Sequence, residues 1–120
     1  MAVTSSAIAS PQQLYQDQPA TTVGSLFTAP AYISGGNVSD PSSTMYITEI
    51  LAVNSSGGVA DAQVYMGGTA ASNLIAWIHF DDNDTYRLEL KTMMPAAAVV
   101  YGVQSVSGAI TLTISGAAVA

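Results

Sequence analysis

Apolar and polar residues alternate along most of this chain with a period of two, which is the period of side chains along a β-strand. The clearest runs are residues 86–91 and 109–115, where apolar side chains alternate with charged or hydroxyl side chains. Other strand-like runs occupy residues 21–28, 45–53, 62–66, 74–80 and 99–106. These runs recur about every ten residues, with turn residues between them and no sustained period of 3.6. The sequence therefore predicts an all-β fold, an antiparallel β-sandwich of jelly-roll or other Greek-key type.

Two pairs of these runs are separated by short turns and predict β-hairpins. Residues 54–58, Asn-Ser-Ser-Gly-Gly, form the strongest turn cluster and would join the runs 45–53 and 62–66. The Ser-Gly turn at residues 107–108 would join the runs 99–106 and 109–115 in the same way.

Strand faces follow from the same alternation. In the run 45–53 a regular strand places Ile47, Glu49, Leu51 and Val53 on one face and Tyr46, Thr48, Ile50 and Ala52 on the other. Neither face is wholly polar, so we expect an inner strand that is covered on both sides. In the run 86–91 we expect Tyr86, Leu88 and Leu90 to face the core.

The first twenty residues lack either period and contain two prolines, which predicts an extended N-terminal arm over residues 1–20. Leu14 and Tyr15 are the residues expected to anchor it. Residues 21–120 then form a single sandwich domain, with a long Gly/Ser/Pro-containing loop between the strand at 21–28 and the strand at 45–53. An arm of this kind is either loose in an isolated chain or ordered across a neighbouring subunit in an assembly.

Composition adds a reason to expect assembly. Of the 120 residues, 49% are hydrophobic and only 8% are charged, whereas soluble domains average about 25% charged residues. Soluble monomers usually keep a charged surface. A chain this neutral is typical of a protein whose surface is partly covered by partners.

Charge and cysteine content exclude several classes of function. The formal net charge is −6 and the only basic residues are Arg87 and Lys91, so we expect no nucleic-acid binding, which needs clustered cations. No run is long enough to cross a membrane, and residues 1–13 lack the features of a signal peptide, so we expect neither membrane insertion nor export by that route. Without cysteine there is no disulfide, thiolate nucleophile or Cys-ligated zinc.

Residues able to support catalysis are sparse, and we expect no enzymatic activity and no cofactor. His79 is the only histidine, and no Gly-x-Ser-x-Gly elbow or cysteine accompanies it. Asp81, Asp82 and Asp84 bring several oxygens together and are weak candidates for a hard cation, but they lack the spacing of an EF-hand. A solvated turn is the simpler interpretation of this acidic segment.

The aromatic residues have two interpretations. They could stack on sugar rings if several shared an exposed face, or they could lie in the core and at interfaces, which is commoner. Trp77 lies opposite the more hydrophobic face of its run, so we expect it at a contact between subunits before a sugar site. The residues expected at contacts between subunits are Leu14, Tyr15, Tyr46, Asn54, Trp77 and His79.

Three stretches resemble small structural proteins of tailed bacteriophages. In chain order they are VGSLFTAPA, YITEILAVNSSGGVADAQVYMGG and IAWIHFDDNDTYRLELKTMMPAAAVVYGVQSVSGAITLTISGAAV. The likeness covers about residues 22–119 and is a pattern of strands and turns rather than an invariant motif. It departs at residues 95–98, Pro-Ala-Ala-Ala, where such proteins often have a Gly-Asp turn.

The resemblance implies a virion component with a β-sandwich fold and no catalytic residues. It suggests a capsid decoration (cement) protein that binds the major capsid protein and copies of itself, as a homotrimer or another symmetric cluster. Such a protein would be made in the host cytoplasm and reside on the capsid surface. The alternative is a tail, neck or fibre subunit that presents aromatic residues to a host glycan.

Overall fold

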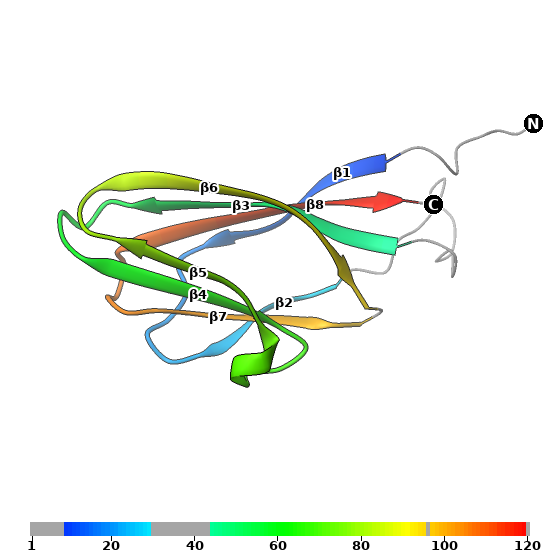
Figure 1. The fold of residues 1–120 in the computed structure, drawn as a ribbon, viewed down its shortest axis with the longest axis horizontal. Helices are drawn as coiled ribbons and strands as arrows, with labels where there is room; N and C mark the ends of the chain where they lie inside the picture. Colours follow the sequence, from blue (N-terminus) through cyan, green and yellow to red (C-terminus); the bar gives the residue numbers. More distant parts are fainter. Residues whose placement is uncertain (1–8, 30–43, 96, 120) are drawn as a thin grey trace, which may run out of the picture.

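The computed structural model describes residues 9–29, 44–95 and 97–119, which form two packed β-sheets. The elements are β1 (Ala9–Asp17), β2 (Gly24–Thr28), β3 (Thr44–Asn54), β4 (Ala60–Met66), the 3-10 turn η3 (Ala71–Asn73), β5 (Leu74–Phe80), β6 (Asp84–Met94), β7 (Val99–Gln104) and β8 (Ile110–Val119). Sheet A has the strand order β1-β8-β3-β6 and sheet B the order β2-β7-β4-β5 (Figure 1). The predicted all-β antiparallel sandwich is confirmed. Within the described part of the chain, no helix is long and apolar enough to span a membrane.

Consecutive strands lie mostly in different sheets. Only β4 and β5 follow one another within one sheet, and both predicted hairpins are wrong: β3 and β8 belong to sheet A, whereas β4 and β7 belong to sheet B (Figure 1). The turns after β3 and after β7 lead the chain across the sandwich instead of back along the same sheet. Strands of either layer have one apolar inner face, so the period of two cannot distinguish these connections.

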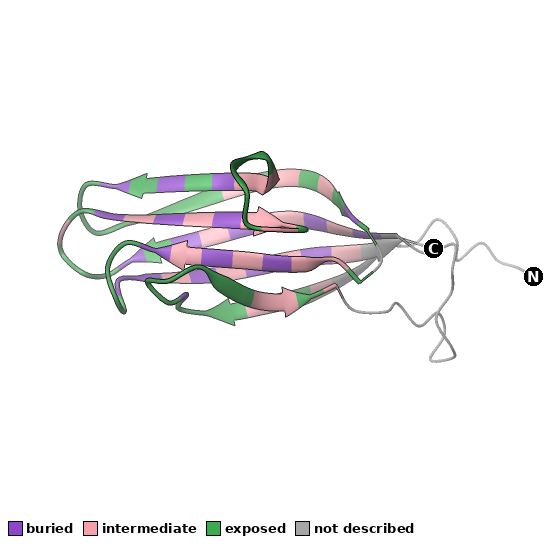
Figure 2. Cartoon of the chain, turned by 90° about the horizontal axis from the view of Figure 1, so that it is seen from below, coloured by how far each residue is buried: buried purple, intermediate pink, exposed green. Residues whose placement is uncertain are grey.

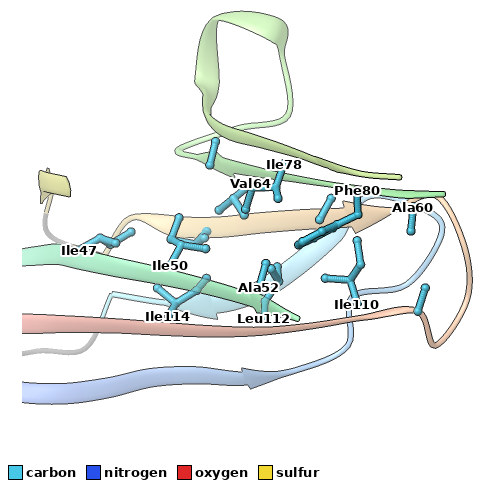
Figure 3. Packing of buried hydrophobic residues seen from close by; sticks show 14 of the residues in the cluster. Ile47, Ile50, Ala52, Ala60, Val64, Ile78, Phe80, Ile110, Leu112 and Ile114 are labelled. Carbon is cyan, nitrogen blue, oxygen red and sulfur yellow. The ribbon is translucent and has the colours of Figure 1, made fainter. Parts of the chain in front are cut away.

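The core lies between the sheets, where apolar side chains from both inner faces interdigitate (Figure 3). Buried and less buried residues alternate along the strands, as the period of two predicts (Figure 2). Sheet A contributes mainly Ile47, Ile50, Ala52, Ile110, Leu112 and Ile114, and sheet B contributes Val64, Ile78, Phe80 and Val100.

A β-bulge in β3 changes the predicted faces of this strand. The register with both β6 and β8 shifts between Ile47 and Glu49. The extra residue of a bulge reverses the alternation, so Ile47 faces the core together with Ile50 and Ala52. The prediction that Ile47 shares a face with Glu49 is therefore wrong. The predicted inner position within a sheet is confirmed, because β3 lies between β8 and β6, whereas Val53 on its outer face is 36% exposed.

Residues 9–17 of the expected N-terminal arm form an edge strand of the sandwich. Strand β1 pairs with β8 along nearly its whole length, with a register shift between Gln13 and Tyr15. Leu14 and Tyr15 are half-buried and pack against the chain's own core, and the Tyr15 ring stacks on Phe27 at 6.2 Å between centroids. The alternation was missed because Pro11, the bulge and several glutamines interrupt it. Residues 1–8 of the expected arm, and the loop expected between the strands at 21–28 and 45–53, lie largely outside the described residues.

Strand β6 is the other edge of sheet A. Leu88 and Leu90 pack against the core as predicted. Tyr86, which the alternation assigned to the same side, is 45% exposed. It lies opposite the buried Ala52, near the start of this edge strand.

Candidate functional site

Four connections gather at one end of the sandwich, which we call the loop end: residues 18–23, 55–59, 81–83 and 105–109 (Figure 1, left). Backbone and side-chain hydrogen bonds tie them to one another. Ser55 N donates to the Ala109 carbonyl at 3.0 Å, and Gly57 N donates to Oδ1 of Asn83 at 2.6 Å. Gln18 Nε2 donates to the Gly108 carbonyl at 3.2 Å. These hydrogen bonds join the four connections into one unit.

Asn54 organises the loop end from inside. Its side chain is only 2% exposed, and Nδ2 donates to the carbonyl oxygens of Gly58 at 2.8 Å and Asp82 at 3.0 Å. Its Oδ1 accepts hydrogen bonds from the backbone N–H and the hydroxyl of Ser56. The expectation that Asn54 is an exposed contact residue is wrong, because every polar atom of its amide is used within the chain.

Gln104 plays a similar part on the opposite side of the loop end. This buried side chain donates through Nε2 to the Pro19 carbonyl at 2.6 Å and accepts through Oε1 from Ile110 N at 2.7 Å. It thereby joins the first connection to β7 and β8. Sequence analysis overlooked it, since a glutamine at the end of a strand is usually exposed.

Three valines project from this hydrogen-bonded end. Val23, Val59 and Val106 are 41%, 60% and 41% exposed, and each belongs to a different connection. Single exposed apolar residues are ordinary on protein surfaces. These three lie on connections that are hydrogen-bonded to one another. The backbone that carries them therefore has little conformational entropy to lose on binding, which favours contact with another protein.

His79 lies between two carboxylates on the outer face of sheet B. Its Nδ1 contacts Oδ1 of Asp61, which is directly opposite on β4, and its Nε2 lies 2.9 Å from Oδ1 of Asp81 in the following turn. The hydrogen bonds to Asp61 and Asp81 raise the pKa of His79 above its ordinary value of 6.5. His79 is exposed, as expected for a contact residue, but both ring nitrogens already have partners within the chain.

This arrangement predicts a pH-dependent contribution of His79 to stability. The pKa of His79 is higher in the folded state, so its contribution is full below pH 6.5 and is lost as pH rises through the folded-state pKa. We expect the difference in free energy of unfolding between the wild type and His79→Gln to shrink as pH rises from about 5 to 9, measured by urea denaturation. In Asp81→Asn, which keeps only the Asp61 carboxylate, the contribution of His79 should be smaller and its decline should end at a lower pH. A difference that does not change with pH would contradict this role.

The acidic turn uses its carboxylates locally. Asp82 accepts from Asn83 N and Asp84 accepts from Thr85 N, both at 2.7 Å, while Asp81 bonds to His79. Among the described residues, no group of three or more His, Cys, Asp or Glu side chains is placed to hold a metal ion. The structure does not bring the three candidate carboxylates to a common point, and their geometry is that of a capped turn.

A shallow cleft of about 230 Å³ lies on the outer face of sheet B, towards the loop end. Trp77, which is 63% exposed, forms one wall. The other lining residues are Thr21, Asp61, Gln63, Val103, Gln104 and Ser105. Trp77 is thus exposed, as a contact residue must be, and the sheet brings polar groups from β4 and β7 beside its indole.

The remaining predicted contact residue, Tyr46, is half-buried in sheet A. The Lys91 ammonium lies 5.9 Å from the centre of its ring, and the neighbouring Arg87 forms an ion pair with Glu49. Both basic side chains of the protein are therefore engaged with their own sheet, and neither lies near Trp77.

No protein-family model matches the sequence, and no curated protein matches it either.

Proposed function

We propose that this protein is a structural component of a tailed-bacteriophage virion, a capsid decoration protein that binds the major capsid protein and stabilises the shell. The resemblance of the strand and turn pattern supports it. The strand order of the sandwich also has the alternation between sheets seen in jelly rolls, a fold used in viral capsid domains. A fold alone does not define a function, so the observation that carries the proposal is the hydrogen-bonded loop end with its three exposed valines.

The loop end is the surface proposed to meet the capsid. Backbone groups of its connections are hydrogen-bonded to one another and to side chains, and the valines supply apolar area that gains free energy when it leaves water. A contact of about 800 Å² per partner is typical of specific protein interfaces. Repetition of such a contact over a symmetric lattice holds many copies in place even when each contact is weak. Self-association, as a homotrimer or another cyclic cluster, would increase this effect.

The proposed role needs no catalytic residue and no cofactor. It places the protein on the capsid surface, after synthesis in the host cytoplasm, without contact with nucleic acid or membrane. The formal charge of −6 supports this, because a surface with so few cations is poorly suited to phosphate backbones.

We expect Val59→Asp to reduce binding to undecorated capsids at least tenfold. Burying an unpaired carboxylate in an apolar contact costs more than the ~1.4 kcal/mol that corresponds to a tenfold change in affinity. Co-sedimentation of the purified variant with capsids measures this. Met93→Asp is the matched control, since Met93 is similarly exposed but lies on β6, away from the loop end, and this variant should bind like the wild type. Full occupancy by Val59→Asp would show that the loop end is not the attachment surface.

A second position in the virion, in a tail, neck or fibre, has one observation in its favour. The exposed Trp77 and the cleft beside it would suit a subunit that contacts host glycans. The number of copies per particle separates the two positions: hundreds are expected for a decoration protein, and a dozen or fewer for a tail or neck subunit.

A further inference from the structure

The outer face of sheet B differs from that of sheet A in its chemistry. Sheet A carries Arg87 and Lys91 with their partners Glu49 and Tyr46. On sheet B, Tyr65 lies directly opposite Tyr101, and Gln63 lies between Trp77 and Val103. This face carries three aromatic side chains and the Gln63 amide, and its charged residues among those described belong to the His79 cluster at one end.

Trp77 supplies a flat apolar surface at the edge of the cleft. An indole of this exposure, 63%, keeps a large apolar area in water in the free protein. The C–H groups on one face of a pyranose ring cover such a surface well, and the π-electrons of the indole attract their partial positive charge. At about 230 Å³ the cleft is smaller than the roughly 300–1,000 Å³ of pockets for drug-sized ligands. It therefore suits one sugar ring, with further units lying outside.

Polar groups around the Trp77 indole have donors and acceptors that can still form hydrogen bonds with a ligand. The amide oxygen of Gln63 accepts from the Tyr65 hydroxyl at 2.8 Å, which leaves its N–H groups to donate. Oδ1 of Asp61 is bound to His79, which leaves Oδ2 to accept. The Ser105 hydroxyl oxygen accepts from Asp61 N at 2.8 Å and still has its own hydrogen to donate. Donors and acceptors side by side are what the adjacent hydroxyl groups of a sugar require.

The charge around the cleft defines the ligand class further. Asp61 lines it, the protein's formal net charge is −6, and both Arg87 and Lys91 lie on the other sheet. His79, the nearest group able to carry positive charge, is shared by two carboxylates. An anionic ligand would find no unpaired cation among these residues. Burying an anion without a cationic partner costs free energy, and a ligand whose polar groups are neutral hydroxyls avoids that cost.

We propose that Trp77, Gln63 and Asp61 form a binding site for one ring of a neutral saccharide. Saccharide binding does not require attachment to a capsid. A variant such as Val59→Asp should therefore retain it, so the two proposals can fail independently.

The single tryptophan makes the test direct, because the intrinsic tryptophan fluorescence of this protein comes from Trp77 alone. Titration with cellohexaose, maltohexaose, xylohexaose and mannohexaose should give, for at least one of them, a saturable blue shift of the emission and protection from acrylamide quenching. 3′-Sialyllactose, as an anionic probe, should give neither. A glycan array then extends the panel to other neutral and anionic glycans.

Substitutions distinguish binding at the proposed saccharide site from binding elsewhere on the surface. Gln63→Ala should weaken binding of the active saccharide about tenfold, as expected for the loss of one or two hydrogen bonds. Trp77→Ala should abolish binding in calorimetry, and Trp77→Phe should weaken it while keeping a ring in place. Tyr86→Ala, which removes an exposed aromatic ring from sheet A, should bind like the wild type. Absence of binding to every neutral glycan, binding to anionic glycans only, or undiminished binding by Trp77→Ala would overturn the proposal.

Discussion

Replacing Asn54 with alanine is expected to lower the free energy of unfolding by about 3 kcal/mol, because it removes four hydrogen bonds made by a residue that is almost fully buried. The substitution removes the two bonds donated by Nδ2 to the Gly58 and Asp82 carbonyls and the two bonds accepted from Ser56. Water cannot readily replace them at a position that is 2% exposed. Urea denaturation of the wild type and the variant, followed by circular dichroism, measures the change.

Asn83→Ala is the matched control for this prediction. Asn83 is exposed and accepts one bond from Gly57 N at the same end of the sandwich, so its loss should cost about 1 kcal/mol or less. Equal losses in the two variants would show that Asn54 does not hold the loop end together. Asn54→Ala should also bind capsids more weakly under conditions where it remains folded, because it loosens the proposed attachment surface.

Gly116→Ala is expected to destabilise the sandwich by about 3 kcal/mol through overpacking. Gly116 is buried in β8, opposite Ile47 of β3 beside the bulge and opposite Gln12 of β1. A β-carbon there would overlap the Tyr46 carbonyl oxygen and approach Cδ1 of Leu14 to 2.7 Å. Leu14 can move, but the carbonyl belongs to the β3 backbone, so the two strands must separate and weaken their hydrogen bonds.

Gly58→Ala tests whether the loss of stability in Gly116→Ala comes from the contact between the added β-carbon and the β3 backbone. An added β-carbon at Gly58 meets nothing within 4 Å, so its effect should be within about 0.5 kcal/mol of zero. Thermal unfolding of the two variants in parallel gives the comparison. Similar melting temperatures for Gly116→Ala and the wild type would mean that β8 and β3 can adjust without loss.

The strands themselves were largely predictable from sequence. The period of two identified the strand at 74–80 with its observed bounds and located most of the others, because half-buried strands must alternate. The layer to which each strand belongs was not predictable. The cluster after Asn54 is suited equally to a hairpin and to a crossing between sheets, and only packing against the whole sandwich distinguishes the two.

Local irregularities account for the remaining differences. The bulge between Ile47 and Glu49 reverses the faces of β3 without a glycine or proline to signal it. Strand β1 was hidden because an edge strand needs less apolar alternation than an inner one. Among the candidate site residues, the exposure of Trp77 followed from its position opposite an apolar face. The burial of Asn54 and Gln104 depends on carbonyl and N–H groups from distant parts of the chain, which sequence patterns do not reveal.

The central claim, that the protein decorates a phage capsid through its loop end, is tested most directly by electron cryomicroscopy of particles that contain it. The proposal predicts hundreds of copies on the capsid lattice, with the connections bearing the exposed Val23, Val59 and Val106 against the shell. A small number of copies at the tail or neck, or a capsid surface that carries no copy, would contradict that claim.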